Sequence, residues 1–368
     1  MPEPINLHER WSKRIEKEYR ENGLVFPHLN QGAVASELQG VKTVMVSQLI
    51  TVPYSDYSLS ATPGTRYGEV SEVGDYVQEF TMTQQKSFNR FIEGVTNMDQ
   101  QGLKSAARVI QSQIREQGVP SRDKYALSVL AHKGGMIVSN ATALSKSNVI
   151  DRITDATATL NDKEVPSDGR TLYVPANVYK LIRTSDQFMQ IEQMGNTALR
   201  KGQVGRLDNM AVVEIPASRW PASVNFIIVH KDAAIAGKKI DHTTAHTNPL
   251  DYYGTVIQHL EYYDVFVNGP KAVGIYVEVG AGGTVLAAPT INATTGVITG
   301  TGGTVWHTVD GSDPRYSRSA VPGAAPVIPI GQTVTVRAYV QAAAASDTTF
   351  SSAVATAQVT AAAGGGGD

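Results

Sequence analysis

The chain has 368 residues, enough for two or three domains and a sizeable core. Its 42% hydrophobic and 18% charged residues are ordinary for a globular protein, and a net charge of −2 argues against binding nucleic acid through massed Lys and Arg. The absence of cysteine excludes disulfides and thiol chemistry. The charged N-terminus differs from a signal peptide, and no apolar run approaches the roughly 20 residues of a membrane span. We therefore expect a soluble protein made in the cytoplasm.

Residues 1–40 are predicted to form an N-terminal arm. Four apolar residues recur every fourth position among charged ones: Leu7, Trp11, Ile15 and Tyr19. On a helix they would form one apolar stripe that needs a partner surface. An ordinary core helix gives the same pattern, but the position before an unsupported hairpin favours packing against another subunit.

Residues 41–83 are predicted to form an extended β-hairpin. β-branched residues dominate Lys42–Val52, and a strand with alternating faces begins at Tyr76. The stretch between them, PYSDYSLSATPGTRYG, is rich in turn-forming residues and would form the tip. Because such a hairpin has little of its own to pack against, something else must cover it. The residues expected to contact a neighbour at the tip are Tyr57, Arg66 and Tyr67.

A long helix is predicted over residues 84–117. The apolar residues that fit its stripe are Phe88, Phe91, Ile92, Val95, Leu103, Ala106, Ile110 and Ile114. Gly118-Val119-Pro120 is expected to end this helix, and Ser121 to cap the next one, which runs through Leu130.

The rest of the body, up to residue 280, alternates short helices and strands. The expected elements are a helix over 147–160, a buried strand Arg170–Val174, a helix from Pro175 through Leu181, and strands at Val204–Ile215 and Phe226–Val229. Two further strands, Tyr262–Val267 and Ala272–Val277, flank Asn268-Gly269-Pro270 and are interpreted as a hairpin. The mixture predicts an α+β fold.

The composition changes after Glu278. The 90 residues that follow contain three Arg, four Asp, and no Lys or Glu. We expect a glycine-rich linker at 281–288 that lets the next unit swing, an independently folded β-sandwich at 289–361, and a flexible tail at 362–368.

No catalytic or cofactor site can be argued from the motifs. His242 and His246 could share a metal on a helix, but Thr243, Thr244 and a nearby Asn-Pro favour a strand or loop, and no third ligand is fixed by spacing. GAGGTV (280–285) and GTGGTV (300–305) lack the phosphate-loop pattern and are interpreted as turns. We therefore predict a protein that is not an enzyme.

Five phrases resemble, in order, the coat proteins of tailed phages that share the Hong Kong 97 (HK-97) fold. They are VIQSQIREQGVPSRDKYALSVLA (109–131), RTLYVPANVYKLIRTSDQF (170–188), GQVGRLDNMAVVEIPASRWP (202–221), NFIIVHKDAAI (225–235) and YYDVFV…KAVGIYV (262–277). In the first phrase, Pro120, Asp123, Tyr125 and Ser128 occupy the places expected in this family. The resemblance implies an N-arm, an E-loop hairpin, a spine helix, and P and A domains.

The tail carries a second resemblance. VWHTVDGSDPRYSRSA (305–320) followed by GQTVTVRAYV (331–340) resembles the immunoglobulin-like module found after chitobiase and β-hexosaminidase domains. Phage coat proteins often carry such a module on the outer surface. The resemblance implies decoration of the particle and weak binding to host-surface glycans, and we expect the module to be dispensable for shell formation.

The phage resemblance implies a major capsid protein of the virion, assembled in the host bacterial cytoplasm. Its expected partners are itself, in pentamers and hexamers, a portal protein and packaged double-stranded DNA. The short arm leaves no room for a fused scaffolding segment, so a separate scaffolding protein is expected. No Lys occurs between Lys42 and Lys86, so we expect no Lys-mediated cross-link from the E-loop. Two alternatives stay open: an encapsulin-type nanocompartment, and a carbohydrate-binding protein or surface adhesin.

Overall fold

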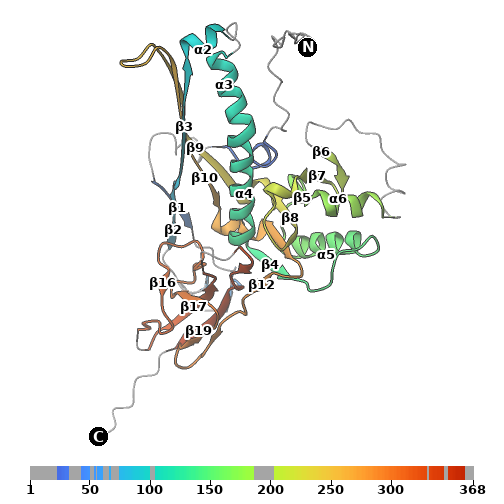
Figure 1. The fold of residues 1–368 in the computed structure, drawn as a ribbon. Coiled ribbons are helices and arrows are strands. Elements are labelled where there is room, and N and C mark those ends of the chain that lie inside the picture. Colours follow the sequence, from blue (N-terminus) through green and yellow to red (C-terminus); the bar gives the residue numbers. More distant parts are fainter. Residues whose placement is uncertain are drawn as a thin grey trace, which may run out of the picture.

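A computed structural model gives the arrangement of the chain (Figure 1). It describes residues 23–360, except 33–42, 50–53, 55, 61–65, 68–73, 100–103, 186–202, 330 and 344–346. The subunit is elongated. A long helix runs through its centre, an α+β body lies to one side, and a β-rich C-terminal module lies at the end opposite α2.

The central helix is one continuous rod. It consists of α3 (Ala106–Gln113), a π-helical turn η2 (Ile114–Gly118) and α4 (Val119–Lys133). The hydroxyl of Ser105 caps its start by accepting the amide of Arg108 at 3.4 Å. Leu127 and Leu130 are fully buried, so packing of one helix face against the body stabilises the rod.

The predicted break at Gly118-Val119-Pro120 is wrong. The amide of Val119 bonds the carbonyl of Ile114, five residues back, and the wider turn leads into α4 with Pro120 in its first turn. Inside a regular α-helix the ring of Pro120 would clash with the carbonyl four residues back, and the π-helical turn widens the helix at that residue. Ser121 lies inside α4 and does not cap it.

Residues 84–93 are a strand, although the sequence predicts a helix. Here β3 (Gln84–Glu93) precedes the short helix α2 (Gly94–Asp99), and it pairs with β10 (Gly254–Val267), which also pairs with β9 (Ala234–Thr247). Both pairings are antiparallel. The register sets Phe88 opposite His259, with the rings stacked at 5.0 Å. The partner strand β10 lies far along the chain, so it leaves no signal in the local spacing of residues 84–93. Pairing with it overrides the helical pattern of these residues.

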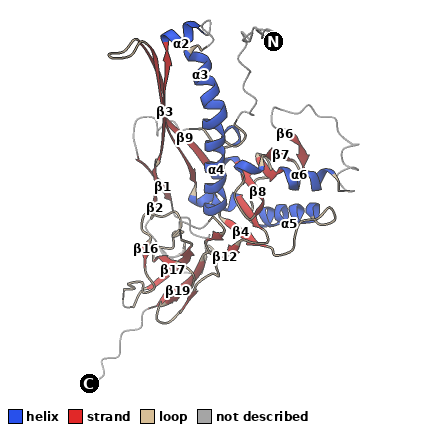
Figure 2. Ribbon diagram, in the orientation of Figure 1, coloured by secondary structure: helices blue, strands red, loops and turns tan. Residues whose placement is uncertain are grey.

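The body is built on a six-stranded sheet of order β4-β11-β8-β5-β7-β6. Its strands are β4 (Met136–Ser139), β5 (Arg170–Pro175), β6 (Gln203–Leu207), β7 (Met210–Ile215), β8 (Val224–His230) and β11 (Ile275–Val279). The helices α5 (Val149–Asp162) and α6 (Ala176–Arg183) lie beside it (Figure 2). Four short 3-10 turns complete the body: η1 (Phe26–His28), η3 (Ala217–Arg219), η4 (Lys231–Ala233) and η5 (Gly269–Gly274).

Both faces of this sheet are buried. On one face, Ile227 and Val277 pack in a core shared with α4, whereas Phe226 and Tyr276 pack on the other face with α5 and α6. The predicted strand Arg170–Val174 is confirmed and is buried along its whole length, as in strands covered on both sides. The helices predicted at 147–160 and after Pro175 are also confirmed.

The hairpin predicted at 262–277 is wrong. The two strands belong to different sheets, since β10 pairs with β3 and β9, whereas β11 pairs with β4 and β8. The turn η5 between them carries the chain from one sheet to the other. Its Gly and Pro residues mark a change of direction, and the sequence alone cannot distinguish this from a hairpin turn.

The hairpin predicted at 41–83 is confirmed at its base. The strands β1 (Thr43–Leu49) and β2 (Asp75–Thr81) pair antiparallel. Phe80 and Met82 are buried against Ile235, Tyr262 and Phe266, so the body of the same subunit covers the base.

The C-terminal module contains a four-stranded antiparallel sheet of order β16-β15-β17-β19 and two short strand pairs. Its strands are β12 (Thr284–Val285), β13 (Thr290–Ile291), β14 (Ile298–Thr299), β15 (Thr304–Thr308), β16 (Val321–Pro322), β17 (Thr333–Gln341), β18 (Thr349–Phe350) and β19 (Ala355–Thr360). Ile298, Val336 and Val359 are buried in a core of its own.

The module does not hang from a free linker. The segment predicted as a linker, 281–288, contains β12, which pairs with β18. Phe350 of β18 is fully buried in the core of the body, and Val285 and Tyr316 pack against that core. The prediction that the glycine-rich junction lets the module swing is therefore wrong, because side chains of the module complete the hydrophobic core of the body.

One ring pair at this junction contains a titratable group. His132, near the end of α4, stacks on Phe350 with the ring centroids 4.7 Å apart. Burial lowers the pKa of His132 from 6.5, against the opposing charge of Asp347. The folded protein therefore favours the neutral imidazole of His132. Its contribution to stability is complete above pH 6.5 and is lost as the pH falls from 6.5 toward the lowered pKa.

We therefore expect the wild-type protein to lose more thermal stability between pH 7.5 and 5 than the His132→Phe variant, which keeps an aromatic ring but cannot titrate. Calorimetry of both proteins across this range measures the difference. Identical pH profiles would contradict the assignment.

Candidate assembly surfaces

The described residues contain no cluster of three or more His, Asp or Glu side chains that could hold a metal ion. His242 and His246 lie exposed on β9, not on a helix, and His242 hydrogen-bonds to the Thr244 hydroxyl at 2.8 Å. No helix among these residues is long and apolar enough to cross a membrane. The candidate sites described below are therefore surfaces of the folded chain.

The N-terminal stripe of Leu7, Trp11, Ile15 and Tyr19 lies outside the described residues. The described part of the chain begins at Gly23, next to α4. The segment from Gly23 onward is held on α4, where the carboxylate of Asp123 accepts the amides of Leu24 at 3.1 Å and Val25 at 3.4 Å. Further on, the amide of Asn30 donates to the carbonyl of Ala234 at 3.0 Å.

Asp123 is also paired with Arg219, whose Nη1 lies 2.9 Å from Oδ2. Both side chains are buried. Burial raises the pKa of Asp123, while the hydrogen bonds from the two amides and the charge of the guanidinium lower it in part. Because all three neighbours are donors, they require the acceptor-only, ionised carboxylate. This pair holds the first described residues of the chain on α4.

The tip of the β1–β2 hairpin brings together the three residues predicted for it. The rings of Tyr57 and Tyr67 meet edge to face, with centroids 4.9 Å apart. The amide of Ser58 donates to the carbonyl of Arg66 at 3.1 Å, which closes the tip. Both tyrosines are exposed, as is the neighbouring Leu59. Whether these residues contact another subunit stays a prediction.

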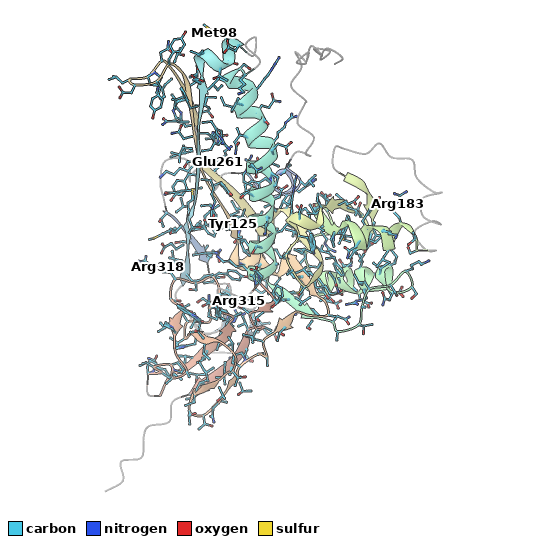
Figure 3. All side chains as sticks on the ribbon, in the orientation of Figure 1. Met98, Tyr125, Arg183, Glu261, Arg315 and Arg318 are labelled. Carbon is cyan, nitrogen blue, oxygen red and sulfur yellow. The ribbon has the colours of Figure 1, made fainter. Side chains whose placement is uncertain are left out.

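A second apolar surface lies at the far end of the β3-β10-β9 sheet, and the sequence analysis missed it. We call it the distal patch; its exposed side chains are Phe91, Val95, Met98, Leu250, Tyr252 and Tyr253. Figure 3 shows Met98 at this end of the subunit. Leu250 is 91% exposed, and the rings of Phe91 and Tyr252 lie 5.1 Å apart. Large exposed apolar patches commonly mark sites of protein–protein contact.

A hydrogen-bonded turn carries three residues of the distal patch, Leu250, Tyr252 and Tyr253. The amide of Asn248 donates to the carbonyl of Gly254 at 2.6 Å, and the amide of Gly254 donates to the Asn248 side chain at 2.9 Å. Asn248 and Asp251 have positive φ, which Asn and Asp tolerate better than most residues. The signal in the sequence was NPLDYYG, where turn-forming residues enclose one Leu and two Tyr.

Of the comparisons with known proteins, only the comparison of structures gives matches. No family model matches the sequence, and no curated protein matches it. A solved structure from Mycobacterium phage Che8 matches with a TM-score of 0.60 and 20% identity, over 74% of this chain and 97% of that chain. The mature capsid of bacteriophage PhiM1 matches with a TM-score of 0.55 and 12% identity, over 75% and 93%. The head structure of Helicobacter pylori bacteriophage KHP40 gives 0.55 and 9%, over 75% and 96%.

The chain therefore shares its fold with phage capsid structures. The α+β arrangement, with a hairpin, a long helix and a two-sided sheet, fits the HK-97-like fold that the sequence predicts. The matched chains are covered almost completely, whereas about a quarter of this chain has no counterpart in them.

The Asp123–Arg219 pair can be tested by Asp123→Asn. This change keeps the shape but removes the buried anion that Arg219 and two amides share, so we expect a loss of about 3 kcal/mol or more in the free energy of unfolding, measured by denaturant titration. The control is Asp155→Asn on the exposed side of α5, expected to change it by less than about 0.5 kcal/mol. Equal small effects would show that the pair does not anchor the segment.

Proposed function

We propose that the chain is a major capsid protein that assembles into pentamers and hexamers of a phage head around double-stranded DNA. The observation that carries the proposal is the fold, because a capsid chain from phage PhiM1 is covered over 93% of its length. The resemblance of five phrases in the sequence supports the same function. The chain then acts by self-association and not by catalysis.

Several surfaces of the subunit are suited to head-to-tail contacts. The hairpin tip and the distal patch expose apolar rings, and Asp123 holds the segment that follows the predicted arm. Head-to-tail contacts close into rings when the rotation permits. Association and ordering costs offset most of the gain from buried area, so single contacts would be reversible while many together hold a shell.

The other expected partners belong to the same proposal. DNA inside the head would be enclosed without sequence specificity, which suits a chain with a net charge of −2. A separate scaffolding protein and a portal protein would direct assembly in the bacterial cytoplasm. An encapsulin-type shell is the alternative; the phage structures that the fold matches favour the capsid.

We propose an immunoglobulin-like C-terminal module on the outer surface of the particle. Its antiparallel sheet, its own core and its resemblance to chitobiase-type modules support this. Glycan binding finds less support. Among the described residues of the module, Tyr339 and Phe350 are buried and Trp306 and Tyr316 are half-buried, so no fully exposed ring is available for stacking on a sugar.

The test is to express the chain with the scaffolding protein encoded beside it and to examine the product by sedimentation and electron microscopy. Closed particles of uniform diameter are expected. A monodisperse monomer under these conditions would refute the capsid proposal, and particles that enclose an enzyme in place of DNA when isolated from the native host would favour the encapsulin-type alternative.

The distal patch can be tested in the same assay with the double variant Leu250→Asp, Tyr253→Ser. Both side chains are exposed, so the variant should fold with unchanged thermal stability while the yield of closed particles falls at least tenfold. The matched control is Val327→Asp, an exposed apolar residue of the module. Normal particle yields from the double variant would exclude the patch as an assembly contact.

A further inference from the structure

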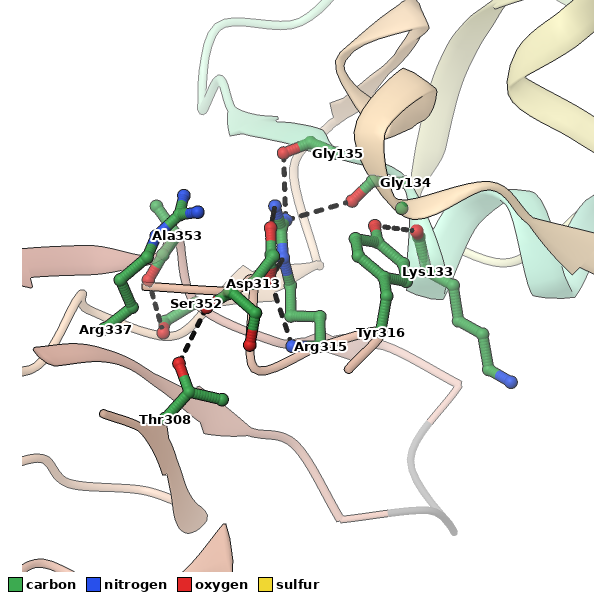
Figure 4. Close-up of polar contacts among 12 residues, drawn as sticks. Lys133, Gly134, Gly135, Thr308, Asp313, Arg315, Tyr316, Arg337, Ser352 and Ala353 are labelled. Carbon is green, nitrogen blue, oxygen red and sulfur yellow. Dashed lines mark hydrogen bonds and ion pairs between the residues drawn. The ribbon is translucent and has the colours of Figure 1, made fainter. Parts of the chain in front are cut away.

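The loop Asp313–Arg318, between β15 and β16, lies where the module meets two other parts of the subunit. We call it the clamp loop. Figure 4 shows that it reaches the end of α4, and Figure 3 places Arg315 and Arg318 at this junction. The loop provides two of the three arginines that follow Glu278.

On one side the clamp loop holds the C-terminal end of α4. The hydroxyl of Tyr316 donates to the carbonyl of Lys133 at 2.6 Å, and Nη1 of Arg315 donates to the carbonyl of Gly135 at 2.9 Å. The last carbonyls of a helix have no partner within it, and a positive charge there is favourable. Asp313 fixes the guanidinium in place with two bonds, of 3.1 and 2.8 Å.

On the other side the clamp loop holds the β1–β2 hairpin. The amide of Arg318 donates to the carbonyl of Val77 at 3.0 Å, and Ser317 forms an antiparallel bridge with Gln78. β1 already occupies the other edge of β2, so the loop covers an edge that would otherwise be unpaired at this point.

The side chain of Gln78 completes the link to the body. Its Nε2 donates to the carbonyl of Val267 at 2.8 Å, and its Oε1 accepts the amide of Gly269 at 2.8 Å. A cavity of about 150 Å³ lies beside these contacts, lined by Gln48, Tyr76 and Arg337 among others. The hairpin and the module therefore meet across a partly polar contact.

We infer that the clamp loop is a positioning device that sets the direction of the β1–β2 hairpin relative to α4. The module is then an integral part of the subunit and not a removable decoration. The consequence for assembly rests on the proposed function, because a hairpin that reaches a neighbour must leave the subunit at a fixed angle. The positioning itself does not depend on that function.

Hydrogen exchange on the unassembled, full-length chain tests the clamp. Arg318→Pro removes the amide that bonds Val77, whereas the matched variant Arg318→Ala loses the same side chain and keeps that amide. We expect the amides of Asp75–Thr81 to exchange at least fivefold faster in the proline variant, the effect of about one lost hydrogen bond. Exchange in β5 and β8 reports global unfolding and should not change.

A second variant without proline distinguishes loss of the clamp from local misfolding caused by proline. Arg315→Met, Tyr316→Phe keeps two side chains of similar size but removes the donors to the carbonyls of Gly135 and Lys133, and the same peptide should exchange faster. Unchanged exchange of Asp75–Thr81 in both variants would overturn the inference. The exchange measurement needs no particle, so its result is independent of the test of shell formation. A wild-type chain that never forms shells would refute the capsid proposal, whereas the clamp is tested by exchange alone.

Discussion

Polar contacts along α4 tie several parts of this chain together. Asp123 accepts the two amides that begin the segment leading to the arm, the hydroxyl of Tyr125 donates to Asp264 of β10 at 2.6 Å, and the carbonyl of Lys133 accepts the module's Tyr316. Burial and the Asp264 carboxylate raise the pKa of Tyr125, so it stays a donor at any physiological pH. Three such contacts tie the first described residues of the chain, β10 and the module to one helix.

Patterns that depend on neighbours in the sequence were predictable. The alternation from Tyr76 onward gave a strand whose Gln78 and Phe80 are buried, and the segment Arg170–Val174 gave a strand buried on both sides. The failures share a different cause. The strand β3 depends on pairing with β10, and the passage through Pro120 depends on a π-helical turn, and neither leaves a signal in local spacing.

The candidate surfaces divide in the same way. Tyr57, Arg66 and Tyr67 could be placed at one tip from the turn-rich sequence, and the structure brings them together. The distal patch was missed because its members come from three elements that only the fold unites. The low charge of the last 90 residues suggested a loosely attached unit. Yet all three of their arginines make hydrogen bonds near the junction, Arg337 to the carbonyl of Gly311 within the module. The positions of these few charges, and not their number, determine how firmly the module is attached, and composition gives no information on positions.

The most direct test of a shell built from subunits braced by α4 is an electron cryo-microscopy map of the particle at side-chain resolution. We expect the β1–β2 tip and the distal patch to lie against neighbouring subunits, and the module to be as well ordered as the body, with Tyr316 on the end of α4. A map in which those two surfaces face solvent, or in which the module is smeared out beside a well-ordered body, would contradict this organisation.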